Sequence, residues 1–239
     1  MNVNVGLENH PFQVKSTVVN GKTMIEIEPG NQDLDIKYSY RAHKNKNYEG
    51  PIELMGSDSI TISAYKNGQS YGESENHNFV YHKALGQNMI YGSLYSPYYE
   101  SNKKLALVDG LTGSLDFRDG KWQGFYGKDF GNMIRFDSIT SISEVSVQFY
   151  QYINSWIFIP ESVSIEYSLD GENYNKLEAK TAQTPNNQRG KLIEQFVFDM
   201  DNVQAKYLKV KAKALPKVPE WHEAAGSPTW LFIDEIVVK

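Results

Sequence analysis

The stretch Trp230-Leu-Phe-Ile-Asp-Glu-Ile-Val-Val-Lys239 closes the chain with the apolar, β-branched composition of a strand. Much earlier, an Asp109-Gly110 turn leads into Phe117-Arg-Asp-Gly-Lys-Trp-Gln-Gly124. In small β-sandwich modules the first and last strands pair side by side, so an acidic residue of such a turn can meet an acidic residue of the closing strand. This pairing favours a β-sandwich that binds a ligand over an enzyme core.

Alternation of apolar and polar residues with a period of two dominates the chain and is typical of half-buried strands. Residues able to adopt positive φ stand between these segments and close hairpins at low cost. No long stretch shows helical periodicity, so the sequence predicts an all-β protein. The alternating segments are residues 23–28, 34–40, 59–65, 145–149, 163–167 and 207–212, and the turn dipeptides are Asn20-Gly21, Pro29-Gly30, Asn67-Gly68 and Asp170-Gly171.

The composition excludes several classes of function. The 239 residues carry a formal net charge of -5 without a basic stripe, whereas a nucleic-acid-binding face needs Lys and Arg clustered against phosphate. We therefore expect no nucleic-acid partner. The absence of cysteine excludes disulfides, thiol catalysis and cysteine-ligated zinc. The many aromatic residues, 16 Tyr, 11 Phe and 4 Trp, favour strands and flat binding faces.

The start of the chain, Met1-Asn-Val-Asn-Val-Gly-Leu-Glu-Asn-His10, has neither the basic nor the apolar region of a signal peptide. Nowhere do 18 apolar residues run together, so we expect no membrane span. Because Met1 precedes a polar stretch that already alternates like a strand, we expect a fragment of a longer secreted protein. Such a protein would be secreted, periplasmic or displayed on a bacterial cell surface.

A domain boundary is expected close to residue 78. The strand pattern from Phe12 to Glu75 is complete enough for a small sandwich, and Glu75-Asn-His-Asn-Phe-Val-Tyr-His-Lys-Ala-Leu-Gly86 begins a new pattern. We therefore assign residues 1–78 to a small immunoglobulin-like β-sandwich. Residues 79–239 are assigned to a larger jelly-roll β-sandwich.

Segments of the second domain carry, in order, a resemblance to a known family. They are Leu107-Val-Asp-Gly110 with Ser114, then Trp122-Gln-Gly-Phe125, then Ser155-Trp-Ile-Phe-Ile-Pro160, and finally Tyr167-Ser-Leu-Asp-Gly-Glu-Asn-Tyr174. Residues 83 to 239 thereby resemble the factor 5/8 type C, or discoidin-like, domain. Within that family they look most like the carbohydrate-binding modules appended to bacterial glycoside hydrolases.

Two further comparisons narrow the resemblance. Residues 118–125 together with residues 230–236 look like the C-terminal end of a family-20 β-N-acetylhexosaminidase. The first domain resembles the small C-terminal β-domain of chitobiase, through Ile25-Glu-Ile-Glu-Pro-Gly30, Tyr38, Gly50-Pro-Ile-Glu-Leu54 and Ile60-Thr-Ile-Ser-Ala-Tyr-Lys-Asn-Gly68. The resemblance implies a non-catalytic accessory region whose partner is the catalytic domain of the same full-length chain. The TIM barrel of such an enzyme needs about 250 residues of alternating strands and helices, which this chain lacks.

The acidic and histidine residues do not suggest catalysis. Glycoside cleavage needs an acid of raised pKa beside the scissile bond. Asp234 and Glu235 are adjacent on a strand, so their side chains point to opposite faces. The five histidines have no His-Glu-x-x-His spacing, and no Gly-x-Ser-x-Gly elbow occurs. We therefore predict a binding protein without catalytic residues.

A structural calcium ion is the metal that the resemblance implies. Ca²⁺ accepts carboxylate, hydroxyl and carbonyl oxygens held in a flexible loop. The ligands would be the carboxylate of Asp109, the hydroxyl or carbonyl of Ser114, and Glu235 from the closing strand. The alternative is that Asp109 makes only an Asx-turn and that Glu235 is an exposed strand residue.

Glycan binding needs an aromatic ring that stacks on the apolar face of a sugar, flanked by groups that bind its hydroxyls. One loop offers Arg118 and Trp122, and a Gly/Pro-rich loop before the last strand offers Trp221 and His222. We expect these loops to converge at one end of the sandwich, where Trp156 could join them. The expected ligand is a galactosyl or N-acetylhexosaminyl glycan.

Three of these residues also have a structural interpretation, whereas we expect Trp221 and His222 to be exposed. Trp122 could pack beneath the loops, Trp156 could belong to the core, and Arg118 could form a solvated ion pair with Asp119 that contributes little. Two other functions stay open at this point. One is a domain pair without sugar affinity that buttresses the absent catalytic barrel, and the other is a cell-surface protein-binding module.

Overall fold

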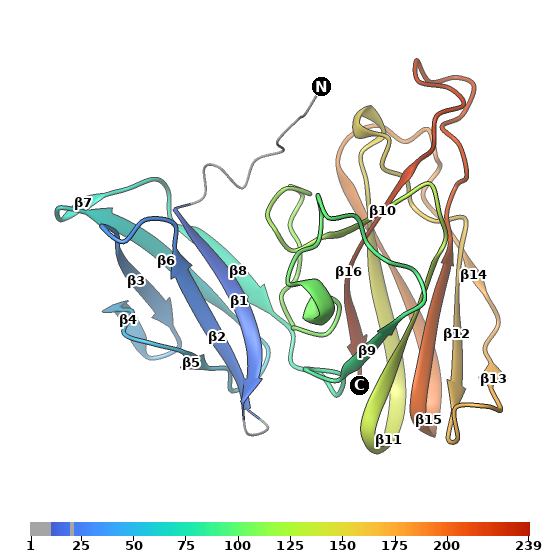
Figure 1. Ribbon diagram of the computed structural model, residues 1–239, viewed down its shortest axis with the longest axis horizontal. Helices are drawn as coiled ribbons and strands as arrows, with labels where there is room; N and C mark the ends of the chain where they lie inside the picture. Colours follow the sequence, from blue (N-terminus) through green and yellow to red (C-terminus); the bar gives the residue numbers. More distant parts are fainter. Residues whose placement is uncertain (1–10, 20–21) are drawn as a thin grey trace.

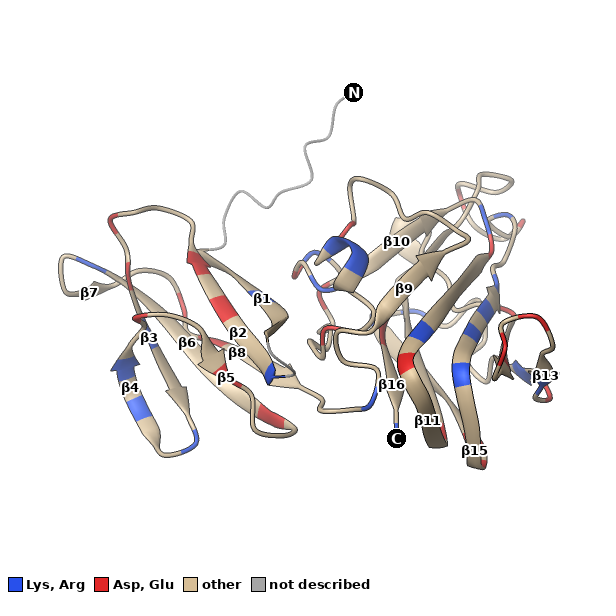
Figure 2. Ribbon diagram, turned by 60° about the horizontal axis from the view of Figure 1, so that its bottom comes forward, with Lys and Arg blue, Asp and Glu red and all other residues tan. Residues whose placement is uncertain are grey.

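The computed structural model describes residues 11–19 and 22–239, which form two β units lying side by side (Figure 1). The only helices among the described residues are two short 3-10 turns, η1 (Lys103–Leu105) and η2 (Ile153–Ser155). The all-β prediction is confirmed. The expected Asn20-Gly21 turn and the alternating start of the chain lie outside the described residues. Acidic and basic residues are interspersed along the strands and loops of both units (Figure 2).

The smaller unit is built from two sheets that enclose a compact apolar core. At the Asn67-Gly68 turn both residues have positive φ, 52° and 77°, so the hairpin between its flanking strands closes as the sequence predicts. One sheet contains β1 (Phe12–Val19), β2 (Lys22–Pro29) and β5 (Ile52–Glu53). The other contains β3 (Asp35–Tyr40), β4 (His43–Asn47), β6 (Asp58–Lys66), β7 (Gln69–Ser70) and β8 (Glu75–Phe79).

The larger unit is a sandwich whose two layers share their longest strands, β11 (Phe130–Gln151) and β15 (Leu192–Lys213). These strands pair along most of their length, with irregularities in register between Arg135 and Thr140 and between Ile142 and Glu144. Such bulges bend a strand pair. The other strands are β9 (Asn88–Tyr91), β10 (Gln123–Tyr126), β12 (Ser162–Ser168), β13 (Asn175–Lys176), β14 (Lys180–Thr181) and β16 (Trp230–Val238).

The bend lets one strand pair serve both layers. Before the bulges β11 pairs with β9, and beyond them it pairs with β16. The last part of β15 pairs with β12. The layers enclose an apolar core whose fully buried members include Phe149, Ile165, Leu208, Val210 and Ile233. Within the sheet, the closing strand β16 lies between β10 and β11.

The two units are joined by hydrogen bonds and by a shared apolar residue. The bridge between Phe79 and Leu111 continues β8 onto the loop of the larger unit, and Leu111 is buried in the core of the smaller unit. The hydroxyl of Ser16 donates to the carbonyl oxygen of Asp109, and the side-chain amide of Asn102 donates to the carbonyl of Ser16 over 3.0 Å. The boundary predicted after residue 78 falls one residue before the end of β8.

The shared core of the larger unit yields a stability prediction. Phe149 is completely buried in the part of β11 that pairs with β16. Phe149→Ala leaves a cavity and is expected to reduce the free energy of unfolding by about 3–5 kcal/mol. Val197→Ala, at an exposed position of β15, is the control and should change it by less than about 0.5 kcal/mol. Urea unfolding measures both, and equal effects of the two substitutions would contradict the described core.

Candidate functional site

The acid of the turn and the acid of the closing strand meet in the interior. Asp109 and Glu235 are 4% and 1% exposed, and their carboxyl groups contact each other. Burial raises the pKa of both well above the usual range, and the charge of Glu235 raises the pKa of Asp109 further. Asp234 instead accepts hydrogen bonds from the side-chain amide of Gln148 and the N–H of Gly113, both at 2.6 Å. The side chains of these two adjacent acids of β16 therefore point to opposite faces of the strand.

His82 supports this acid pair as a neutral hydrogen-bond donor. Its Nδ1 accepts from the backbone N–H groups of Ala84 and Val238, at 3.3 and 3.4 Å. The proton therefore lies on Nε2, which donates to Oε1 of Glu235 over 2.8 Å. Burial lowers the pKa of His82 to about 3. The imidazole consequently adds no positive charge beside the two carboxyl groups near neutral pH.

The chemistry of the acid pair fits a hard cation. Oε2 of Glu235 has no hydrogen-bond partner among the described residues, and buried carboxylates need compensation. The structure does not bring Ser114 to the pair, because its hydroxyl accepts from the N–H of Asp116 at 3.1 Å on an exposed turn. Within residues 11–19 and 22–239, no cluster of three or more His, Asp or Glu side chains is arranged to hold a metal ion.

The loop that carries Arg118 and Trp122 lies at the junction of the two units. Trp122 is 1% exposed, its indole N–H donates to the carbonyl of Ser114 over 3.0 Å, and its ring packs against Tyr150. The expectation that Trp122 stacks on a sugar is therefore corrected, because no ring face is free. Arg118 is exposed, and its guanidinium lies over the ring of Phe117. No ion pair joins it to Asp119 among the described residues.

The second expected loop forms a separate group at another edge of the larger unit. Trp221 is 49% exposed, and its ring lies 5.6 Å from that of His222. Nδ1 of His222 accepts from the N–H of Ala224, so its Nε2–H donates to the carbonyl of Ile153. Half-buried Trp156 packs in the same apolar cluster as Ile153. Both nitrogens of His222 are thus committed to holding the loop.

The two predicted groups do not meet as expected. In the part of the chain that the structure describes, no hydrogen bond, ion pair or ring contact joins Arg118 or Trp122 to Trp156, Trp221 or His222. Trp230, at the start of β16, is half-buried and belongs to neither group. Its ring contacts lie at 4.7 to 5.7 Å and involve Tyr99, Tyr126 and Phe232.

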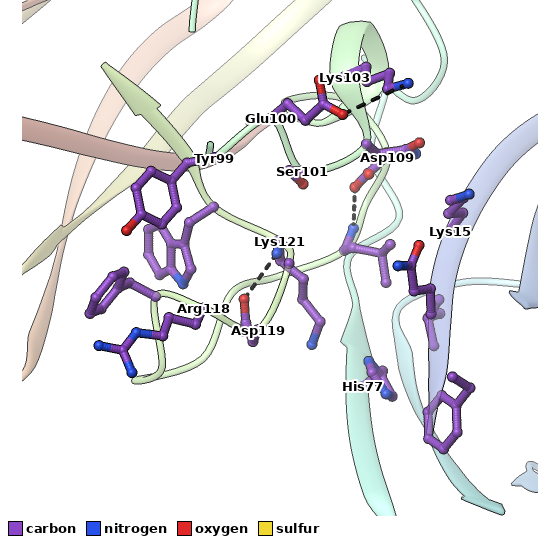
Figure 3. A pocket seen from close by; sticks show the side chains of 18 of the residues that line it. Lys15, His77, Tyr99, Glu100, Ser101, Lys103, Asp109, Arg118, Asp119 and Lys121 are labelled. Atoms are coloured by element: carbon purple, nitrogen blue, oxygen red, sulfur yellow. Dashed lines mark hydrogen bonds and ion pairs between the residues drawn. The ribbon is translucent and has the colours of Figure 1, made fainter. Parts of the chain in front are cut away.

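A cleft of about 280 Å³ opens at the junction and is lined by both units (Figure 3). The smaller unit contributes Phe12 and His77, and the larger unit contributes Tyr99, Arg118 and Lys121. Figure 3 shows the side chain of Lys121 extending from its loop toward the side on which His77 lies. Sequence reasoning missed Lys121, His77 and the supporting His82. Their partners are distant in the chain, and no local spacing signals them.

The chain has matches among protein families and among solved structures. The F5/8 type C domain model matches residues 92–233, more than half of the chain. No curated protein matches. A fucose binding module of Streptococcus pneumoniae has 11% identity and a TM-score of 0.42, with 67% of this chain and 98% of that chain covered. A CBM32 module of a family 31 glycoside hydrolase from Clostridium perfringens has 15% identity and a TM-score of 0.41, with 65% and 94% covered. Such low similarity transfers neither a ligand nor its site residues.

Burial of His77 predicts that acid weakens the fold. Burial foremost lowers the pKa of His77 below its usual 6.5; the charge of Lys121 acts in the same direction, whereas Glu75 and Asp119 oppose it. The unfolded chain therefore binds the proton more readily than the folded protein does. We expect the free energy of unfolding to fall as the pH drops below 6.5, and to fall less steeply in His77→Gln. Urea unfolding at a series of pH values measures both slopes.

The matched control is His43→Gln, which removes an exposed imidazole from β4 of the same unit. This substitution should leave the slope of stability against pH close to that of the wild type. His82 is retained in every variant, so its contribution cancels. An unchanged slope in His77→Gln would contradict the prediction.

Proposed function

The chain belongs to the F5/8 type C domain family, and on that premise we propose that its larger unit binds glycan through the loop that carries Trp221. The apolar face of a pyranose stacks on an exposed aromatic ring. The ligand class that we propose is a galactosyl or N-acetylhexosaminyl glycan. Trp156 in the same loop group would contribute a second indole.

The observation that carries this proposal is a large aromatic side chain exposed on a loop that is itself held in place. Trp221 is 49% exposed, so nearly half of the side chain is available to a ligand. The hydrogen bonds of His222 to Ile153 and Ala224 fix the loop on both sides of the imidazole. A rigid aromatic anchor loses little conformational entropy when a ligand binds. Trp221 therefore contacts the sugar in this proposal, and His222 positions it.

We also propose that the chain is an accessory region of a secreted β-N-acetylhexosaminidase of family 20. This proposal rests on the sequence resemblance of both units. A glycan-binding unit tethered to a catalytic domain raises the effective concentration of substrate without new chemistry. The partner of this chain would then be the catalytic domain of its own full-length protein.

A structural role is the second candidate, and the junction favours it. The smaller unit receives Leu111 from the larger unit into its core, and Ser16 hydrogen-bonds across the seam to Asp109. Units joined in this way move as one body more readily than units on a flexible linker. A rigid pair could buttress a neighbouring catalytic barrel without binding sugar.

For the acid pair we propose a structural calcium ion held by Asp109 and Glu235. Ser114, which the resemblance implies as the third ligand, lies away from the pair and is not part of the proposed site. The ion would neutralise two buried carboxylates and tie the turn to the closing strand. The unpartnered Oε2 of Glu235 supports this assignment.

Trp221→Ala tests the glycan site. We expect the affinity for galactosyl or N-acetylhexosaminyl oligosaccharides to fall about tenfold or more. An aromatic side chain that a bound ligand covers commonly contributes more than about 1.4 kcal/mol to the free energy of binding. Isothermal titration with the glycans that bind on an array gives the measurement. Tyr71→Ala is the control, because Tyr71 is also 49% exposed but lies on the smaller unit.

Equal affinity of the wild type and Trp221→Ala would place the glycan elsewhere. Absence of binding to every glycan on the array would leave the structural role as the function. Circular dichroism of each variant establishes that the fold is retained.

Calcium removal tests the metal site. A chelator should lower the melting temperature of the wild type, because an ion that binds only the folded state stabilises it by mass action. The isosteric variant Glu235→Gln should melt at the same temperature with calcium and with chelator. Magnesium serves as the control ion. A chelator-insensitive melting temperature in the wild type would exclude the calcium assignment.

A further inference from the structure

The junction cleft contains two buried polar side chains that no proposed role has used. Lys121, from the loop of the larger unit, is 8% exposed, and His77, from β8 of the smaller unit, is 5% exposed. Both line the same cleft, and they are close enough for the charge of Lys121 to lower the pKa of His77. The two units therefore present an ammonium and an imidazole to one enclosed space.

Lys121 has no anionic partner among the described residues. Buried lysines are rare unless they are paired, because an unpaired ammonium loses its hydration without compensation. The carboxylate nearest in the chain is Asp119, and backbone N–H groups occupy both of its oxygens. The N–H of Lys121 donates to Oδ1 over 3.0 Å, and the N–H of Ser114 donates to Oδ2 over 2.6 Å.

The other acids that line the cleft also have partners. Glu100 lies 3.8 Å from the ammonium of Lys103, and Glu75 lies 3.3 Å from Nε2 of His77. Asp109 faces Glu235 and accepts from the N–H of Leu111. The side chain of Arg118, like that of Lys121, has no carboxylate partner in the described part of the chain. The cleft thus retains two cations that are available to an anionic ligand.

His77 adds a second feature that a ligand of the cleft must match. Its Nε2 lies 3.3 Å from Oε2 of Glu75, and neither ring nitrogen makes a hydrogen bond to the described residues. A neutral imidazole that directs its N–H toward Glu75 presents Nδ1 as an acceptor. An acceptor of this kind binds a hydroxyl group. The cleft therefore combines a cation for a carboxylate with an acceptor for a hydroxyl.

The walls of the cleft are aromatic. Phe12 lies beside His77, with ring centroids 6.1 Å apart, and Tyr99 packs against Phe117 on the opposite side. The guanidinium of Arg118 lies 5.1 Å from the centroid of the Phe117 ring. Rings of this kind contact the apolar face of a sugar. A volume of about 280 Å³ is at the small end of ligand pockets and suits a short ligand.

We propose that the junction cleft binds a hexuronate residue of an acidic glycan, with its carboxylate on Lys121 and a hydroxyl group on Nδ1 of His77. Arg118 at the rim contributes the second positive charge. The site needs both units, so the smaller unit is part of the recognition surface. It is separate from the Trp221 loop and does not depend on glycan binding there.

Titration with digalacturonate tests this site, and the neutral disaccharide galactobiose is the matched ligand. Lys121→Met keeps the length of the side chain but removes its charge, and we expect the affinity for digalacturonate to fall about tenfold or more. Lys103→Met is the matched control, because Lys103 also lines the cleft but is exposed and paired with Glu100. This control and Trp221→Ala should both bind digalacturonate like the wild type.

Three outcomes would overturn the proposal. The first is equal affinity of the wild type and Lys121→Met for digalacturonate. The second is competition by acetate at the same concentration as digalacturonate, which indicates an adventitious anion. The third is loss of digalacturonate binding in Trp221→Ala, which would place the acidic sugar on the other loop.

A spectroscopic measurement keeps the test independent of variant folding. In the wild-type protein, digalacturonate should shift the imidazole resonances of His77, whereas galactobiose should leave them in place. The resonances of His222, which lies in the other loop group, should not move with digalacturonate. Unshifted His77 resonances at saturating digalacturonate would overturn the proposal.

Discussion

The turn at residues 109–111 is the constraint on which the rest of the structure depends. The carboxyl group of Asp109 meets Glu235 on the closing strand, its carbonyl accepts the hydroxyl of Ser16, and Leu111 enters the core of the smaller unit. Gly110 has a φ of +79°, and a Cβ at this position would lie 2.9 Å from the side chain of Leu85. One tight turn thus fixes the sandwich, its closing strand and the neighbouring unit in a single arrangement.

Several polar groups are buried along this seam. A buried acid pair, a neutral histidine and a buried lysine lie within or beside it, and burial of such groups requires specific partners. His82 supplies one partner to Glu235 without adding charge, because two backbone N–H groups hold its tautomer. Two groups without an ionic partner among the described residues, the carboxylate oxygen Oε2 of Glu235 and the ammonium of Lys121, are the ones that we assign to a cation and to an anion.

The two proposed ligand regions would bind sugars through different interactions, one through aromatic contact and the other through electrostatic attraction. The loop with Trp221 offers exposed aromatic area on a fixed backbone, which suits the apolar face of a neutral sugar. The junction cleft offers the positive charges of Lys121 and Arg118, which attract the carboxylate of an acidic sugar. A chain with both regions could hold one polysaccharide at two points, and this would increase avidity over either contact alone.

The sequence by itself determined the all-β class, because the period-two pattern in segments such as residues 59–65 and 163–167 is local and strong. It also determined the opposite facing of Asp234 and Glu235, which follows from strand geometry alone. Only the tertiary structure decided that Trp122 is buried, that His222 is committed to its loop, and that Lys121 faces His77. Exposure and pairing depend on what packs against a side chain, and those neighbours come from distant segments that no local pattern specifies.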